Sequence, residues 1–199
     1  MGGQTVKAFL ALALSLASTP VFAGWKDEAS SADIDRLTQL PQVRSQALQD
    51  AQHGQGRGDE RVIRRVMGPE GHAIPPHALI GSWRCRELKL GGMTSYMVYD
   101  AWFRCSIRPV RGGLMLQKMN GSQRFMGFLY PENGAWVYLG ASSARGEPYH
   151  RYSGRSPSVG AEVTPDDQIG LLTGIGDNHL RLEMPAVQES LLDVVEFVR

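Results

Sequence analysis

Two segments, GSWRC at residues 81–85 and WFRC at residues 102–105, decide how the fold of this chain is interpreted. Each lies in a run whose alternation predicts a β-strand. They contain the only two cysteines, Cys85 and Cys105, which are 20 positions apart, a separation that suits neighbouring antiparallel strands joined by a loop. In an exported chain, two cysteines predict a disulfide, which would stabilise the fold by about 3 kcal/mol. Free buried thiols or metal ligands are the alternatives, but there is no Cys-x-x-Cys motif.

Residues 1–23 have the features of a secretory signal peptide. Lys7 supplies the positive charge, residues 8–17 form an apolar run, and Val21-Phe22-Ala23 has the small-x-small form that signal peptidase cleaves. The apolar run is shorter than the roughly 20 residues that a transmembrane helix needs, and no later segment is long and apolar enough. We therefore expect a periplasmic or secreted mature protein without a transmembrane segment.

The charge balance argues against a nucleic-acid partner. The formal net charge is +1, and it falls to zero once Lys7 is removed with the signal peptide. A nucleic-acid-binding protein would show a basic stripe. Residues 24–199 provide enough chain for one domain with a proper core, so we expect one folded unit and a monomer.

Residues 24–78 are predicted to form a helical N-terminal segment followed by a connector. Ser30 or Ser31 is expected to cap the first helix, and Pro41 either kinks that helix or starts a second one. A glycine-rich link precedes a short helix that is expected to begin at Asp59, and a proline-rich connector follows that helix.

From residue 79 to residue 199 the hydrophobic period becomes two, which predicts a β-domain. A hairpin turn is expected at residues 131–134, and a long polar stretch at residues 141–165. Residues 190–198 fit either a helix or a strand, and we predict a closing strand because the segment is rich in β-branched residues. The other strands are expected near residues 81–85, 97–107, 114–119, 123–130, 135–139, 169–171 and 180–184.

About seven or eight strands in up-and-down order predict a mainly β fold: an antiparallel, calycin-like barrel with the N-terminal helices packed against it. A barrel also removes the edge strands that invite aggregation. Gly81-x-Trp83, at the start of the first strand, resembles the motif that opens the barrels of lipocalins and of small periplasmic metalloprotease inhibitors.

Further motifs resemble a bacterial family known as domain-of-unknown-function family 4893. They are Asp35-Arg36-Leu37, Gly81-x-Trp83-Arg84-Cys85-Arg86, Phe103-x-Cys105, Gly121-Ser122-Gln123-Arg124, and Pro185 followed by Glu189-Ser190. The resemblance covers most of the chain after residue 23. It implies no activity, because the family has no established one.

The sequence contains no catalytic motif: there is no Gly-x-Ser-x-Gly elbow, no His-Glu-x-x-His and no phosphate-binding glycine loop. His72 and His77 lie in the connector without evident metal-binding partners. Asp166-Asp167 lacks the alternating oxygen ligands of a calcium loop and is expected in a solvated turn. We therefore predict no catalytic residue, cofactor or metal.

The candidate ligand-binding residues lie in two segments. The polar loop at residues 142–160 interleaves arginines with aromatic residues, a combination that can bind an anionic or sugar-like ligand, although a mobile surface loop is the alternative. Gln123 and Arg124 follow a turn and are expected at the barrel rim, or Arg124 packs on Trp83 or binds backbone carbonyls. The candidate ligand-binding residues are Gln123, Arg124, Arg145, Tyr149, His150 and Arg151.

The sequence is compatible with three functions. The first is an exported, non-enzymatic binding protein for a small or envelope-derived ligand. The second is a periplasmic inhibitor of a hydrolase, whose partner would be a protein. The third is a hydrolase that uses His150 with a carboxylate such as Glu147. The missing nucleophile motif favours the binding protein over the hydrolase. The barrel interior distinguishes the binding protein from the inhibitor: a cavity favours ligand binding, and a filled core with a projecting N-terminal segment favours an inhibitor.

Overall fold

The computed structural model describes residues 24–54, 57–93, 95–154, 166–186 and 188–199. The predicted signal peptide, residues 1–23, lies outside the described residues, and so does the part of the polar loop from 155 to 165. No helix in the described part of the chain is long and apolar enough to cross a membrane. The helices are α1 (Trp25–Glu28), α2 (Ser31–Thr38), α3 (Leu40–Ala51), α4 (Arg57–Met67) and α5 (Pro76–Leu79).

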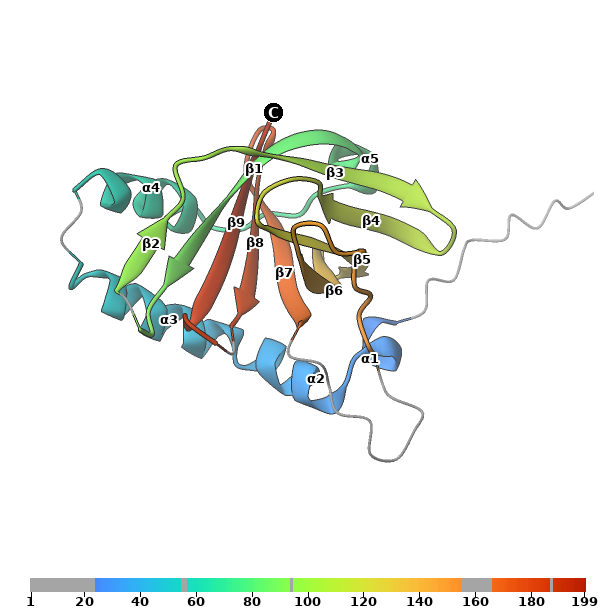
Figure 1. The fold of residues 1–199 in the computed structure, drawn as a ribbon, viewed down its shortest axis with the longest axis horizontal. Coiled ribbons are helices and arrows are strands. Elements are labelled where there is room, and N and C mark those ends of the chain that lie inside the picture. The colour runs from blue at the N-terminus through green and yellow to red at the C-terminus, as the bar shows by residue number, and fades with distance from the viewer. Residues whose placement is uncertain (1–23, 55–56, 94, 155–165, 187) are drawn as a thin grey trace, which may run out of the picture.

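The strands form one antiparallel sheet that closes on itself (Figure 1). β1 pairs with β3 along one edge and with β9 along the other, which joins eight strands into a barrel and leaves β2 as one strand outside it. The predicted mainly β antiparallel barrel with N-terminal helices is therefore confirmed. The strands are β1 (Gly81–Leu90), β2 (Tyr96–Val98), β3 (Phe103–Val110), β4 (Gly113–Lys118), β5 (Gln123–Glu132), β6 (Ala135–Ala144), β7 (Asp167–Gly176), β8 (His179–Pro185) and β9 (Leu192–Val198).

Several predicted boundaries change. The single strand expected at residues 97–107 is divided into β2 and β3, which pair with opposite ends of the same side of β1. Leu88 pairs with Val98 whereas Cys85 pairs with Phe103, so the β2–β3 segment carries two extra residues and must loop out between the two pairings. β6 continues to Ala144, and the polar loop starts there instead of at residue 141. α4 starts at Arg57, before the expected Asp59.

Two predicted features, the hairpin turn between β5 and β6 and the C-terminal strand, are present in the structure. Asn133 and Gly134 have φ angles of 47° and 85°, which give the two-residue hairpin between β5 and β6 the twist that flanking strands require. The ambiguous C-terminal segment forms the strand β9, which pairs with β1 from Arg84 to Leu90. This pairing closes the barrel.

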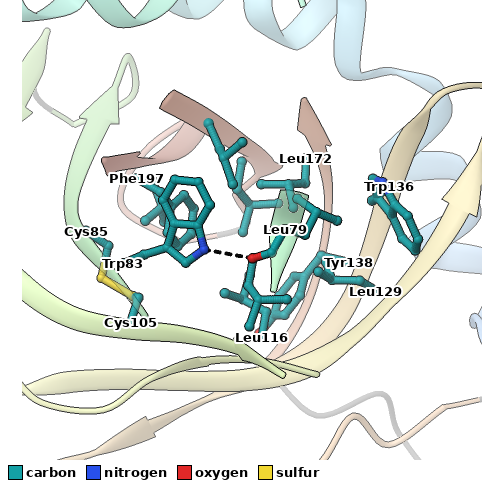
Figure 2. Packing of buried hydrophobic residues seen from close by; sticks show 14 of the residues in the cluster. Leu79, Trp83, Cys85, Cys105, Leu116, Leu129, Trp136, Tyr138, Leu172 and Phe197 are labelled. Atoms are coloured by element: carbon teal, nitrogen blue, oxygen red, sulfur yellow. Dashed lines mark hydrogen bonds between the residues drawn. A yellow bond between two sulfur atoms is a disulfide. The ribbon is translucent and has the colours of Figure 1, made fainter. Parts of the chain in front are cut away.

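The barrel interior is filled with apolar side chains at the end near α5 (Figure 2). Leu79 and Trp83 enter this end, and the Trp83 indole Nε1 donates a hydrogen bond to the Leu79 carbonyl at 2.8 Å. The Arg199 guanidinium lies 3.8 Å from the centre of the Trp83 ring, in the position that Arg124 was expected to take. The predicted disulfide between Cys85 and Cys105 is present and joins β1 to β3 inside the barrel. The interior therefore resembles a protein core and not the hollow of a ligand-carrying barrel.

A layer of buried charges attaches the helices to the outside of the barrel. α2 and α3 lie against β7, β8 and β9 (Figure 1). Beneath them, Arg181 Nε lies 2.8 Å from Glu183 Oε2, and Arg181 Nη1 donates to the carbonyls of Val66 at 2.9 Å and Pro69 at 3.0 Å. A second pair, Arg86 Nε and Glu196 Oε2, is 2.6 Å apart. Each buried ion is thus paired, which is what allows charges to stay in this layer.

Candidate functional site

The barrel interior changes from apolar to charged toward the end opposite α5. On β1 the inward side chains are Trp83 and Cys85, followed by Glu87 and Lys89. On β9 the inward series ends with Asp193, which pairs with Lys89 in the register of β1 and β9. The open end of the barrel, which we call the mouth, is therefore lined by ionisable side chains that rigid strands hold in place.

Lys118 lies beside the mouth, at the end of the inward-facing series of β4 and in contact with Glu87. Its side chain is only 2% exposed, it forms an ion pair with Glu87, and its Nζ lies 4.2 Å from the centre of the Phe103 ring. A lysine is buried in this way only when its charge is compensated, here by the carboxylate and by the aromatic face. The pair separates the apolar core from the solvent at the mouth.

The second charged group of the mouth is centred on Lys89. Its Nζ lies 2.7 Å from Glu189 Oε2. Burial by itself would lower the pKa of Lys89, but the hydrogen bond to Glu189 and the nearby charge of Asp193 raise this pKa overall. Burial raises the pKa of Asp193, and the hydrogen bond from the Ser190 hydroxyl opposes this rise only in part. Asp193 is therefore a carboxylate whose environment leaves it short of compensation.

These groups surround a cavity of about 100 Å³. That volume corresponds to only a few water molecules, each of which occupies about 30 Å³ in the liquid. Phe125 and Met184 line its apolar side, and amide and hydroxyl groups from β5, β6 and β7 face the charged wall. These polar residues are Gln123, Ser142 and Gln168. The cavity can thus receive a small polar group, such as the end of a longer molecule.

The structure brings together some of the predicted ligand-binding residues. Gln123 and Arg124 both line the mouth. The Arg124 guanidinium lies 4.4 Å from the centre of the Tyr149 ring and donates to the carbonyls of Ala144, at 2.9 Å, and of Glu147. The Tyr149 hydroxyl donates to the Lys118 carbonyl at 3.0 Å. Arg124 and Tyr149 therefore fix the start of the polar loop against the rim of the mouth, and the predicted bonding of Arg124 to carbonyls is present.

Other predicted residues lie apart from this group. Arg145 is exposed, and its backbone N–H donates to the Ser122 carbonyl at 2.8 Å. Arg151 lies on the outside of the barrel, in a different cavity from the mouth. His150 Nδ1 lies 3.0 Å from Asp166 Oδ2, next to the rim. The six residues are thus divided between the rim and the outer surface, and their role in binding stays a prediction.

The contacts of His150 bear on the hydrolase alternative. Ser142 donates to one oxygen of Asp166 at 3.2 Å, while His150 contacts the other oxygen. In a nucleophilic triad the hydroxyl bonds to the imidazole, and the carboxylate orients that imidazole from its far side. Here the carboxylate stands between the serine and the histidine. Glu147 Oε2 lies 3.7 Å from His150 Nε2, and both side chains are exposed. This geometry supplies no activated nucleophile.

The other candidate metal ligands are also spread out. His72 pairs through its backbone with Gly174, and His77 is an exposed residue of α5. Asp167 is buried and accepts a hydrogen bond from the Ser153 N–H at 3.0 Å. Within the part of the chain that the structure describes, no three His, Cys, Asp or Glu side chains lie close enough together to hold a metal ion.

The sequence reasoning did not identify Glu87, Lys89 and Asp193, which supply charges of the mouth, or Lys118, which pairs with Glu87 beside it. A signal for two of them was present: Glu87 and Lys89 continue the alternation of Trp83 and Cys85, so polar residues occupy positions that should face the core. Only the pairing of β1 with β9 brings Asp193 beside them.

The comparison with protein families gives one finding. The family described as Domain of unknown function (DUF4893) matches residues 25–197, and the chain belongs to this family. Neither the curated proteins nor the solved structures contain a match.

Proposed function

We propose that this member of the DUF4893 family is an exported, non-enzymatic binding protein that recognises a polar group of a small or envelope-derived ligand at the mouth of its barrel. The observation that carries the proposal is the placement of ionisable side chains around a cavity at one end of a barrel whose other end is filled. Export is supported by the signal-like residues 1–23 and by the disulfide, which persists in oxidising compartments.

The mouth offers complementary groups on facing walls. Lys89 and Asp193 supply a cation and an incompletely compensated carboxylate, and Gln123, Ser142 and Gln168 supply amide and hydroxyl groups opposite them. Such a set suits a hydroxyl, amine or amide group, as found at the ends of sugars and peptides. Because the cavity is small, it would hold one such group while the rest of the ligand lies along the rim, near Arg124.

The test is a thermal-unfolding screen of the mature protein with glucosamine, N-acetylglucosamine, glucuronic acid and D-alanyl-D-alanine. A ligand at 100 times its Kd stabilises a protein by about 2.7 kcal/mol, which raises Tm by about 5 to 10 °C for a domain of this size. The ε-methyl NMR signal of Met184, which lines the mouth, should shift with the same ligand.

Variants locate the binding. Lys89→Gln and Asp193→Asn should reduce the rise in Tm by more than half. Lys26→Gln, which changes an exposed lysine of α1 outside the mouth, should leave it unchanged. The proposal is wrong if none of the four probes shifts either Tm or the Met184 signal, or if the two mouth variants respond as the control does.

The filled barrel gives the inhibitor alternative one point of support, because an inhibitor needs a rigid scaffold and no cavity. An inhibitor was also expected to project its N-terminal segment. The described N-terminal residues instead pack on the barrel: Trp25 is buried, and its Nε1 donates to Glu132 Oε2 at 2.8 Å. The packed N-terminal residues therefore favour the binding function over the inhibitor. Capture of one hydrolase from a periplasmic extract, with loss of that hydrolase's activity, would favour the inhibitor instead.

A further inference from the structure

β5 is apolar on both of its faces. Phe125 and Leu129 face the core, while Met126, Phe128 and Tyr130 alternate with them and face outward. Helices cover the outer faces of the neighbouring part of the barrel: α2 packs on β7 and β8, α3 on β8, β9 and β1, and α4 on β2. Half-buried apolar side chains on an outer face that these helices leave free need a physical explanation.

The outward side chains form the floor of a groove of about 530 Å³. Phe128 pairs with Met115 of β4 on one side and with Leu139 of β6 on the other, so these three side chains lie in a row across the sheet. Met126 and Tyr130 lie on either side of Phe128 along β5. The volume falls in the range of about 300 to 1,000 Å³ that small-molecule sites occupy.

Two walls rise from this floor, α1 and the segment 151–154. The Tyr152 hydroxyl accepts a hydrogen bond from the Ser30 N–H at 2.9 Å and donates to Asp33. Trp25 anchors α1 by its bond to Glu132. The walls are thus fixed by contacts with the rest of the fold, and a ligand would not have to order them.

The charge of the groove is acidic. Two carboxylates, Asp27 and Glu28, and one cation, Arg151, line it. Neither carboxylate takes part in the ion pairs formed among the described residues. Burial raises the pKa of Tyr130, and the charge of Glu28 raises it further, which places this carboxylate near the aromatic floor. The ring centres of Phe128 and Tyr130 are 6.5 Å apart.

From this combination we infer that the groove is a second binding site, for an amphiphilic cation: an apolar or aromatic body on the methionine and aromatic floor, and an ammonium group against Asp27, Glu28 and the ring faces. Carboxylates attract an ammonium group by charge, and aromatic faces attract it through the negative potential above the ring. Methionine side chains adapt to the shape of an apolar body. An anionic body of the same shape would meet two carboxylates.

The test compares three probes of one shape and different charge: benzyltrimethylammonium, its neutral isostere neopentylbenzene, and benzylsulfonate. Binding is followed through the methionine ε-methyl NMR signals, because Met115 and Met126 line the groove whereas Met184 lines the mouth. The cation should shift Met115 and Met126 saturably and leave Met184 unchanged. Its affinity should exceed that of the neutral isostere by about threefold to thirtyfold, the range from exposed to desolvated cation–π contacts.

Variants test the charge assignment. Glu28→Gln and Phe128→Ala should each weaken the binding of benzyltrimethylammonium by about threefold or more. Arg151→Gln should strengthen this binding, because it removes a positive charge that repels the probe. Glu70→Gln, an exposed glutamate remote from the groove, is the matched control. Each variant is first shown to be folded by its cooperative thermal unfolding and by an unchanged Met184 methyl signal, and Glu28→Gln decides the question if Phe128→Ala does not fold.

Three results would overturn the inference: equal or tighter binding of the neutral or anionic probe, shifts of Met184 instead of Met115 and Met126, or no saturable shift with the cation. These results are independent of the sugar and peptide screen at the mouth, so either site can fail alone.

Discussion

Arg181 is the buried charge whose removal should destabilise the protein most. Its side chain is 1% exposed beneath the helices, with Glu183 Oε2 2.8 Å from Nε and with the carbonyls of Val66 and Pro69 bonded to Nη1. Arg181→Met keeps most of the volume, removes all three contacts and leaves the Glu183 carboxylate, 3% exposed, without its nearest partner. An uncompensated buried charge costs about 3 to 5 kcal/mol.

The expected loss lies at the lower end of that range. Arg44 Nε is 3.4 Å from Glu183 Oε1 and still compensates part of the charge. A loss of about 3 kcal/mol is nevertheless a large part of the 5 to 15 kcal/mol that stabilises a typical domain. The assay is unfolding in guanidinium chloride with the disulfide intact, read as the free energy of unfolding.

A second variant separates lost charge pairing from lost packing. Arg181→Met with Glu183→Leu should recover at least about 1 kcal/mol relative to Arg181→Met, because an apolar pair leaves no buried ion. Arg61→Met, an exposed arginine of α4, should change stability by less than about 0.5 kcal/mol. The reasoning fails if Arg181→Met unfolds at the wild-type midpoint, or if the double variant is no more stable than the single one.

Three further predictions follow from the barrel. Alkylation of the exported protein without reductant should label neither Cys85 nor Cys105, and removing both thiols should cost about 3 kcal/mol; two labelled thiols would contradict the disulfide. Trp83→Ala should cost about 3 to 5 kcal/mol, whereas Trp102→Ala, at a partly exposed position between β2 and β3, should cost less; equal denaturation midpoints would rule out a core role for Trp83. Because burial raises the pKa of Asp193 above 3.8, the folded state binds this proton more tightly than the unfolded state, so stability falls as pH rises from about 3.8 through the folded pKa. Asp193→Asn should remove that loss and be more stable than wild type at pH 7, and identical pH profiles would count against it.

The sequence predicted the features that local chemistry determines. Alternation located most strands of the barrel, Asn133-Gly134 predicted the hairpin, and two cysteines in strands predicted the disulfide. The helix break at Pro41 was also anticipated: α2 ends at Thr38, and α3 begins at Leu40 with the proline in its first turn. The hairpin and helix-break signals act within a few residues, and the two cysteines lie on strands that are close in the chain, 20 positions apart.

The interruption at residues 99–102 was not predictable in the same way. Alternation continues through it, yet the two parts of the strand pair with opposite ends of β1 in registers two residues apart. Only the partner strand determines that offset.

The mouth also depends on pairing between distant strands: Lys89 meets Asp193 because β1 pairs with β9, and the two residues are more than a hundred positions apart in the chain. Arg199 similarly reaches Trp83 from the far end of the sequence.

The two sets of buried charge differ in what surrounds them, and this difference supports placing the binding function at the mouth. In the layer beneath the helices, Arg181 pairs with Glu183 and bonds to carbonyls at the end of α4, so attachment of that helix accounts for it. Arg86 pairs with Glu196, which Arg65 of α4 also contacts. At the mouth, Glu87 and Lys89 occupy inward positions where apolar residues would continue the core at lower cost. Packing alone gives no reason for charges there. A charged set that opens onto a cavity is where polar groups of a ligand can replace water, so substitutions at Trp83 should alter stability, whereas substitutions at Lys89 should alter binding.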